Sequence, residues 1–229
     1  MIDSQDSSKK LLLIGATASL GSALVSQAQQ RGYQVTGTFR TESKKYSEIS
    51  EWLELDLSKL ASIENFSREV DGGQFDLIIF LAGATNTERN DLQEYVLTHF
   101  INSIMLFEII IKKFAQKSPC CFVFVSSRAA IYPSYDTYYS AIKSGLSSAL
   151  RSLSKNAHTQ SKFLSILPGL ITGSGMYWQM SLDVRENHKD RSSNSLLSIK
   201  EATESIFEII DRRSEYVNGD MIEIGPSYL

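Results

Sequence analysis

Tyr139 and Lys143 are the residues whose types and spacing most clearly suggest chemistry. They lie four residues apart in a segment with a helical pattern, so both side chains are expected on one helix face, one turn apart. A phenol has an ordinary pKa of about 10, and a neighbouring ammonium group favours the phenolate and lowers that pKa. The pair could therefore serve as an acid–base catalyst, although the same spacing also arises by chance on exposed helices. Tyr138 competes for the role, but it lacks the four-residue spacing and would point about 100° away.

A second candidate site lies between Gly15 and Gly21, after an apolar run and before a helical pattern. Glycine allows a tight turn and the close approach of a pyrophosphate group. The start of the following helix offers N–H groups and a favourable dipole to an anion. The segment could thus bind phosphate, although the same residues would also make a plain turn between a strand and a helix.

The elements that must position these residues alternate between short apolar runs and helical patterns. Strands are predicted at 10–14, 33–39, 51–55, 76–82, 120–125, 163–167 and 221–224, and helices at 20–31, 58–70, 92–116, 137–158 and 199–212. Strands that are separated by helices imply right-handed crossovers and a parallel sheet that is covered on both faces. We therefore predict one doubly wound α/β domain with three layers, α/β/α, over residues 9–229.

Composition narrows the class of protein. The chain has 229 residues, of which 42% are hydrophobic and 21% charged, and its net charge of −3 gives no reason to expect binding to nucleic acid or an anionic membrane. No metal site is predicted. Cys120 and Cys121 are adjacent in a predicted strand, so they should point to opposite faces as free thiols in a reducing compartment. No apolar run looks long enough to span a bilayer, and residues 1–8 have no signal core, so we expect a cytoplasmic protein with a disordered N-terminus.

The order and spacing of these motifs resemble the short-chain dehydrogenase/reductase family, classical type, over about residues 9 to 226. Gly15 and Gly21 match the first and third glycines of the family's loop, whereas Ser19 stands at the second and Ile14 stands where a Thr is common. The run Leu81-Ala82-Gly83 matches the family's Asn-Ala-Gly, with Leu81 in place of Asn. The resemblance implies a Rossmann domain that transfers hydride between a nicotinamide dinucleotide and a carbonyl or alcohol carbon of a small molecule.

The resemblance also implies catalytic roles. Tyr139 would be the general acid or base, Lys143 would bind the nicotinamide ribose and lower the pKa of Tyr139, and Asn102 would support a helix distortion and a proton path. The catalytic serine is either Ser126, which has the family's usual spacing of 13 residues to Tyr139, or Ser127, which has the usual motif context. We favour Ser127, because loops absorb deletions more readily than strand ends.

The end of the second predicted strand indicates which dinucleotide is bound. An acidic residue there would favour NAD(H), but the chain has Arg40, Thr41 and Ser43, which could bind the 2′-phosphate of NADP(H). NADP(H) is therefore preferred over NAD(H). Asp56 matches the family's adenine-binding Asp and could equally begin a helix. The resemblance places the following residues around the dinucleotide: Gly15, Thr17, Ser19, Leu20, Gly21, Arg40, Thr41, Asp56, Leu57, Ala82, Gly83, Tyr139, Lys143, Pro168, Gly169 and Thr172.

The substrate and the partners are less constrained. Residues 173–198 are polar and weakly periodic, which predicts a mobile loop or lid over the substrate. The expected substrate wall contains Arg89, Arg128, Tyr132, Tyr135, Tyr177, Trp178 and Arg185, which could suit a polar, anionic or sugar-like molecule. The resemblance implies a homodimer or homotetramer formed through helices 92–116 and 137–158. A non-catalytic dinucleotide-binding sensor or scaffold is the alternative; the departures at Ile14, Ser19 and Leu81 favour it, and the intact Ser, Tyr, Lys and Asn set argues against it.

Overall fold

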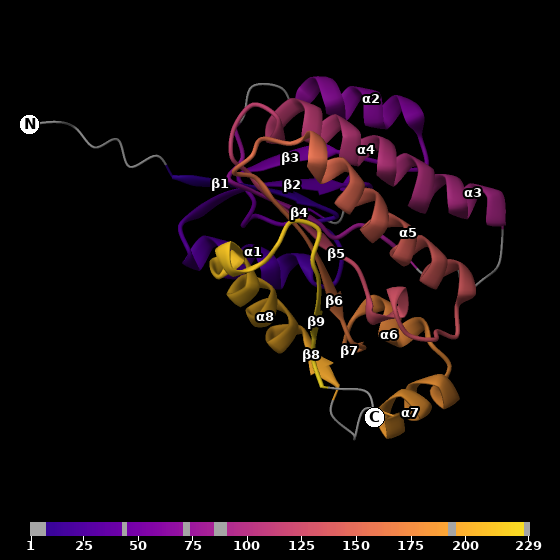
Figure 1. The fold of residues 1–229 in the computed structure, drawn as a ribbon. Coiled ribbons are helices and arrows are strands. Elements are labelled where there is room, and N and C mark those ends of the chain that lie inside the picture. Colours follow the sequence, from indigo (N-terminus) through magenta and orange to yellow (C-terminus); the bar gives the residue numbers. More distant parts are fainter. Residues whose placement is uncertain (1–7, 43–44, 71–73, 85–90, 192–195, 227–229) are drawn as a thin grey trace, which may run out of the picture.

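A parallel sheet forms the centre of the molecule (Figure 1). The computed structural model describes residues 8–42, 45–70, 74–84, 91–191 and 196–226. Within these residues the sheet has seven strands, in the order β3-β2-β1-β4-β5-β6-β9. Their bounds are β1 Lys9–Ile14, β2 Tyr33–Phe39, β3 Glu51–Glu54, β4 Leu77–Phe80, β5 Cys121–Val125, β6 Lys162–Pro168 and β9 Met221–Ile224. The strand order reverses between β1 and β4, so the predicted doubly wound sheet is confirmed, and ligands of such sheets bind at the carboxyl ends of the strands beside this point.

Helices cover both faces of the sheet, which gives the predicted three layers (Figure 1). The helices α1 Gly21–Gln30 and α8 Ile199–Asp211 cover one face, and α2 Leu60–Glu69, α4 Asn102–Ile110 and α5 Thr137–Leu153 cover the other. Helix α4 continues α3 Leu92–Val96 through a π-turn, η2 Leu97–Ile101, and ends in a second, η3 Ile111–Ala115. Short 3₁₀ turns occur at η4 Arg128–Ala130, η5 Ser154–Asn156 and η6 Arg213–Glu215.

Strand β5 shows how the sequence divides the core. Cys121, Val123 and Val125 face α1 and α8, whereas Phe122 and Phe124 face α4 and α5, because neighbouring side chains on a strand point to opposite faces. The aromatic rings on the second face pack edge to face, and each buried Phe contributes roughly 1.5–3 kcal/mol. Cys120 and Cys121 are buried free thiols in different halves of the core, as predicted.

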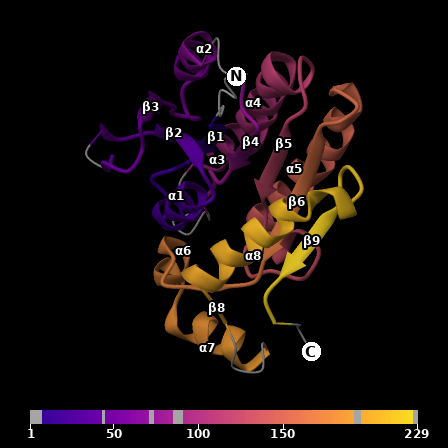
Figure 2. The same ribbon diagram turned by 90° about the vertical axis from the view of Figure 1, so that its left-hand side faces the viewer.

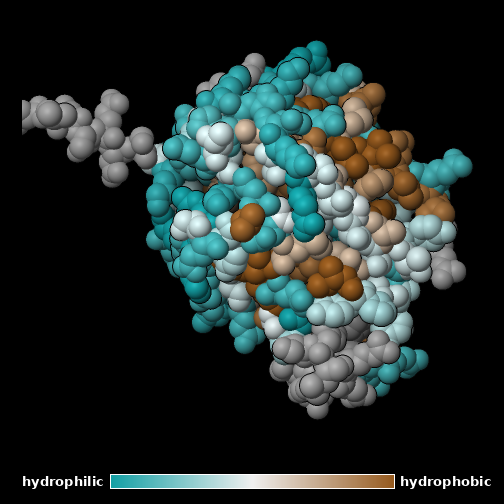
Figure 3. Space-filling model, in the orientation of Figure 1, coloured by the Kyte–Doolittle hydropathy of each residue, from teal (hydrophilic) through white to brown (hydrophobic). Residues whose placement is uncertain are grey.

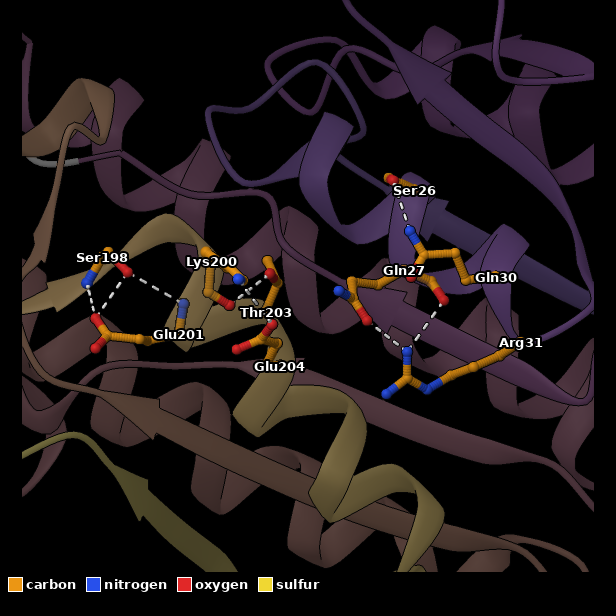
Figure 4. A network of polar contacts seen from close by, with 9 residues as sticks. All are labelled: Ser26, Gln27, Gln30, Arg31, Ser198, Lys200, Glu201, Thr203 and Glu204. Carbon is orange, nitrogen blue, oxygen red and sulfur yellow. Dashed lines mark hydrogen bonds and ion pairs between the residues drawn. The ribbon is translucent and has the colours of Figure 1, made fainter.

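The contact between α1 and α8 is both polar and aromatic. The Arg31 guanidinium lies 4.7 Å from the centre of the Phe207 ring and 3.2 Å from the Asp211 carboxylate. In Figure 4, Arg31 donates to Gln27 on α1, and Ser198 and Glu201 form the capping box that starts α8. These contacts fix α8 against α1 and so position the segment that precedes α8.

That segment differs from the predicted loop. It contains α6 Gly175–Gln179 and α7 Leu182–Arg191, and β7 Ile171–Thr172 pairs with β8 Leu197–Ser198 at its base. Helix α7 is mostly polar, and its two apolar residues, Leu182 and Val184, are too few to form the apolar stripe by which a helix is recognised in a sequence. Figures 1 and 2 show α6 and α7 beyond the carboxyl ends of the strands, with α6 beside α1 in Figure 2. We call α6, α7 and the two residues between them, that is residues 175–191, the lid.

The helix from Leu92 to Ala115 is long and apolar enough to cross a membrane, contrary to the expectation from the sequence. Leu106, Phe107 and Ile110 on its inner side are fully buried against the sheet. The helix therefore packs one side against the sheet, and its length and composition alone do not make it a membrane span, because core helices pass the same test.

Candidate active site

A cavity of about 1010 Å³ lies at the carboxyl ends of β4, β5 and β6. Gly83 follows β4, Ser127 follows β5 and Gly169 follows β6, and all three line the cavity together with Tyr139 and Lys143 from α5. The lid forms a further wall through Met176, Gln179, Met180 and Val184. The sheet therefore brings the residues predicted for acid–base chemistry together at one concave site.

Tyr139 and Ser127 contact each other. The Asp136 carboxylate accepts a hydrogen bond of 2.9 Å from the Tyr139 backbone N–H and so caps α5. This start places Tyr139 in the first turn of α5, where its side chain is buried and the neighbouring Ser127 side chain lowers the pKa of its phenol. The Ser127 Oγ also accepts from the Ala129 N–H at 3.1 Å, which fixes the serine rotamer.

Ser126 faces Ser147, about two turns further along α5 than Tyr139. Its Oγ lies 3.1 Å from the Ser147 Oγ and 3.4 Å from the Lys143 carbonyl oxygen, and its side chain is buried. Neighbouring residues at the end of a strand point in opposite directions, so only one of the two serines can face Tyr139. The geometry selects Ser127 for that position.

Lys143 is buried beneath the segment that follows β4. Its Nζ donates to the Val125 carbonyl at 3.2 Å and lies 4.8 Å from the centre of the Phe124 ring and 5.7 Å from that of Tyr139. A Cβ on Gly83 would lie 3.1 Å from this Nζ, so glycine leaves the ammonium group room at the cavity wall. Tyr138, by contrast, is 49% exposed where it lines the cavity, and it lacks the four-residue spacing to Lys143.

Burial dominates the electrostatics of the pair. The pKa of Tyr139 is raised to about 12: burial is the largest cause, the Ser127 side chain lowers the pKa and the Asp136 carboxylate raises it. Burial also lowers the pKa of Lys143 to about 8. The expected lowering of the Tyr139 pKa by Lys143 is not found in this structure: burial, Ser127 and Asp136 set that pKa, and burial is the largest of the three.

Asn102 stands where the π-turn meets α4. Its backbone N–H bonds to the carbonyl of Leu97, five residues earlier, and its side-chain Nδ2 donates to the Leu57 carbonyl at 2.7 Å. The helix distortion that the resemblance implied at Asn102 is therefore present. The side chain holds the distorted helix against the turn that follows β3.

His99 and Tyr95 are site residues that the sequence reasoning missed. They lie one turn apart before Asn102, with ring centres 4.9 Å apart, and the Tyr95 hydroxyl donates to the Ala84 carbonyl at 2.8 Å. The His99 Nδ1 is buried without a hydrogen-bond partner among the described residues. The pKa of His99 is lowered to about 4, chiefly by burial and then by the positive charges of Lys143 and Arg40. The spacing of four to Tyr95 was the only signal in the sequence.

The glycine loop is shaped by close backbone contacts. Gly15 has φ +84°, and a Cβ there would lie 2.9 Å from the Ala82 nitrogen. A Cβ on Gly21 would lie 1.7 Å from the Ala16 carbonyl oxygen, which no packing could accommodate. Among the described residues no side chain caps α1, so its first N–H groups point to the end of the sheet where an anion could bind.

Arg40 directly follows β2, and its side chain is exposed at the same end of the sheet. Thr41 is exposed beside it, and Ser43 lies outside the described residues. The glycine loop lies beside the end of β2, where the Gly15 N–H donates to the Thr38 hydroxyl at 2.9 Å, so the uncapped start of α1 and the Arg40 cation lie at the same end of the sheet. These residues fit a dinucleotide.

Asp56 is used by its own turn. Its Oδ1 accepts from the Ser58 N–H at 3.0 Å and from the Ser58 hydroxyl at 2.7 Å, and its Oδ2 pairs with the Lys59 ammonium at 3.3 Å. Burial raises the pKa of Asp56, but these bonds outweigh burial and the net shift is downward. The role that the structure shows for Asp56 is to fix the turn before α2.

Two further predicted cofactor residues bond to the lid segment. The Thr172 hydroxyl donates to the Leu197 carbonyl at 3.1 Å, across the β7–β8 pair. The Ser19 Oγ accepts from the Gly175 N–H at 2.7 Å. Leu20, Pro168 and Gly169, in contrast, line the cavity as expected.

The two described arginines of the expected substrate wall make protein contacts. Arg128 is buried, lies 3.2 Å from the Glu223 carboxylate and donates to the carbonyls of Gly225 and Pro226, so it anchors the residues after β9. Arg185 stacks over the Tyr177 and Trp178 rings at 5.4 and 5.5 Å and so joins α7 to α6. Arg89 lies outside the described residues.

The aromatic residues of that wall have separate positions. Tyr132 and Tyr135 line the cavity, and the Tyr132 hydroxyl donates to Glu223 at 3.1 Å. Tyr177 is buried inside the lid, and Trp178 is 64% exposed on it. The described wall is therefore less basic than the sequence suggested.

Comparison with known proteins agrees with the geometry. Residues 11–155, more than half of the chain, match the model of the NAD-dependent epimerase/dehydratase family. No curated protein sequence matches the chain. A short-chain dehydrogenase family protein from Francisella tularensis superposes with a TM-score of 0.79 at 17% identity, over 95% of this chain and 97% of that chain.

Two other solved structures are similar. A dehydrogenase/reductase from Sinorhizobium meliloti has a TM-score of 0.78 at 16% identity, over 94% of this chain and 93% of that one. The ligand-free aldohexose dehydrogenase of Thermoplasma acidophilum has a TM-score of 0.77 at 12% identity, over 95% and 92% of the two chains. At these identities the three structures show the shared fold.

Proposed function

The chain belongs to the short-chain dehydrogenase/reductase family, through the NAD-dependent epimerase/dehydratase group that it matches, and on this premise we propose that it is an NADP(H)-dependent oxidoreductase acting on a carbonyl or alcohol group of a small molecule. The observation that carries the proposal is the contact of Tyr139 with Ser127, beside Lys143, in a cavity at the carboxyl ends of the strands. A module that only binds a dinucleotide has no use for a buried phenol and amine at that place.

Each residue has a part in the reaction. In the reductive direction, Tyr139 donates its proton to the substrate oxygen, and a phenol with a pKa of about 12 carries that proton at neutral pH. Ser127 donates a hydrogen bond to the same oxygen as negative charge develops on it. Lys143 holds a positive charge near the phenolate that remains, and Asn102 keeps the distorted helix in place beside the site. The bound nicotinamide supplies the hydride.

The preference for NADP(H) rests on the end of β2. Arg40 is exposed there, and its charge reaches His99. Glu42, the nearest acidic residue, is paired with Lys45 at 2.7 Å. A guanidinium group can bind a 2′-phosphate with two hydrogen bonds, whereas it has no matching partner in a 2′-hydroxyl. Replacing Arg40 by Ser should therefore weaken NADPH binding more than NADH binding.

The substrate that fits the described wall has an apolar part beside the reacting oxygen. The lid contributes Met176, Met180 and Val184 to the cavity, and Leu92 contributes from α3. Arg128 and Arg185, which suggested an anionic substrate, are engaged in protein contacts. A screen of carbonyl compounds should therefore begin with uncharged ones.

The proposal is tested with Tyr139→Phe and with Tyr138→Phe as the matched control. Removing a general acid costs about 10²-fold or more in rate, so Tyr139→Phe should lose carbonyl reduction yet still bind NADPH when titrated by nicotinamide fluorescence. Tyr138→Phe should keep both, because Tyr138 lines the cavity as a half-exposed side chain and lacks the helical spacing to Lys143. Normal turnover by Tyr139→Phe contradicts the mechanism. NADPH binding without turnover of any carbonyl compound by the unmodified protein favours the sensor alternative.

A further inference from the structure

Ser19 joins two parts of the molecule that are 156 residues apart in sequence. Its Oγ accepts a hydrogen bond of 2.7 Å from the Gly175 N–H, the first residue of the lid. A Cβ on Gly175 would lie 3.1 Å from this Oγ, so glycine there allows the close approach. The glycine loop and the lid are thus bonded directly to each other.

The bond lies at the rim of the cavity. Leu20, next to Ser19, lines the cavity, and so do Ser174 and Met176 on either side of Gly175. Ser19 lies inside the turn that the Gly21 N–H closes on the Ala18 carbonyl, just before the uncapped start of α1. The bond therefore crosses the route between the phosphate-binding end and the chemical end of the site.

The lid is held together around Gly175 by its own contacts. The Ser174 Oγ accepts from the Tyr177 N–H at 3.2 Å and caps α6, and the Tyr177 side chain is buried. Arg185 on α7 stacks on Tyr177 and Trp178 of α6. A displacement at Gly175 is therefore passed to both helices and to their cavity-lining side chains.

On the N-terminal side of Gly175, the lid is joined to β7 through a turn at Gly173. Gly173 has φ +79°, a conformation that other residues rarely adopt, and it directly follows the β7–β8 pair that anchors the base of the lid. Just after this turn, at the first residue of α6, the lid backbone is bonded to the Ser19 hydroxyl of the glycine loop.

We propose that Ser19 is a positioning residue that fastens the lid to the glycine loop, so that a bound dinucleotide leaves only after this bond opens. The inference rests on the proposed function for the nature of the ligand, but the fastening itself does not. Removing the hydroxyl should loosen the lid in the free protein and speed the release of the dinucleotide.

The test compares Ser19→Ala, which removes the hydroxyl, with Ser19→Thr, which keeps it. Ser22→Ala is the matched control, since Ser22 is an exposed serine in the first turn of α1. A hydrogen bond is worth about 0.5–1.5 kcal/mol, so amide exchange at Gly175 in the free protein should be about three- to tenfold faster in Ser19→Ala. It should be near normal in Ser19→Thr and Ser22→Ala.

NADPH dissociation, followed by the loss of nicotinamide fluorescence in a stopped-flow chase, supplies the second measurement. Ser19→Ala should release NADPH about three- to tenfold faster, and Ser19→Thr should restore the slow release. Unchanged exchange at Gly175 in Ser19→Ala overturns the fastening. Faster exchange with unchanged or slower NADPH release overturns the link to the ligand and makes the hydroxyl an obstacle to the phosphate. If the unmodified protein binds neither NADPH nor NADH, the proposed function fails and the release step fails with it, while the exchange measurement still decides the fastening.

Discussion

At the scale of single residues, the exclusion of water governs Tyr139 and Lys143 more than their attraction does. Both side chains are less than a tenth exposed. Burial raises the pKa of Tyr139 and lowers that of Lys143, and each shift favours the neutral form of the side chain. A protonated phenol is suited to donating a proton to a carbonyl oxygen. The same burial makes the ammonium form of Lys143 costly to the fold, because a buried charge loses its hydration.

Lys143→Met should therefore stabilise the protein while it abolishes turnover. A pKa of about 8 in place of the usual 10.5 corresponds to about 3 kcal/mol of destabilisation below pH 8. The unfolded chain keeps the Lys143 proton up to about pH 10.5 whereas the folded chain releases it near 8, so the stability of the unmodified protein rises between these values. Urea unfolding at pH 7 and pH 10.5 should show a gain of about 1–3 kcal/mol for Lys143→Met that shrinks at the higher pH. A loss of stability at pH 7 would contradict the argument.

Ser127→Ala and Ser126→Ala should have opposite consequences. Ser127 faces Tyr139, so its loss should lower the rate of carbonyl reduction about 10²-fold, the usual effect of removing a hydrogen-bond donor to a developing oxyanion. Ser126 is buried against Ser147, so its loss should instead reduce the free energy of unfolding by about 1 kcal/mol. Steady-state rates and urea midpoints, measured on both variants, separate the two roles. A larger loss of rate for Ser126→Ala would reverse the assignment.

At the scale of elements, the long helix over the second face of the sheet is shaped by its π-turn. The turn widens the helix at Leu97–Ile101 and places Tyr95 and His99 toward the segment after β4. Asn102 then returns the helix to α geometry and bonds to Leu57. π-turns are frequent at functional sites, which agrees with the place of this one beside the cavity.

Asn102→Ala should destabilise the protein through this contact. The Leu57 carbonyl would lose its buried donor, at a cost of about 1–3 kcal/mol. Asn65→Ala on α2, where the side chain is exposed, is the matched control and should stay within about 0.5 kcal/mol. Urea unfolding at neutral pH measures both. Equal midpoints for the two variants would show that the bond to Leu57 has no net effect.

The elements also show where the sequence was informative and where it was not. Strands such as Leu77–Phe80 are continuous apolar runs, which predict a strand buried on both faces. Helix α7 has no apolar stripe, so its pattern resembled a loop. The bond from Ser19 to Gly175 depends on how two distant segments pack, and the raised pKa of Tyr139 depends on burial, so neither could be read from local spacing. The choice between Ser126 and Ser127 likewise needed the end of β5 in three dimensions.

At the scale of the whole molecule, an apolar surface remains uncovered on the outer side of η2 and α4. Leu97 and Ile101 are 48% and 43% exposed there, one turn apart, and Figure 3 shows apolar side chains gathered over this side of the molecule. The neighbouring face of α5 carries small residues such as Ala141, Ser144 and Ser148. Small residues allow a second copy to approach closely, so we propose that this surface joins two copies of the chain.

Ile101→Glu should therefore shift the protein toward the monomer. A carboxylate in an apolar interface loses its hydration without a partner, which weakens association. Leu60→Glu, at an equally exposed apolar position on α2, is the matched control and should leave the mass unchanged. Sedimentation velocity over a range of concentrations distinguishes the two variants. A single mass for the unmodified protein and both variants would rule out this interface.

Cys120 and Cys121, the two thiols of the chain, offer a way to watch the lid. Both are buried, and burial raises the pKa of each thiol, for Cys121 to about 12, so neither presents a reactive thiolate to a maleimide dye while the fold is closed. A cysteine introduced at the exposed Trp178 position would then be the only one that the dye labels. No natural cysteine therefore has to be removed before a dye is attached to the lid, and the fluorescence of that dye would report changes in the position of the lid over time.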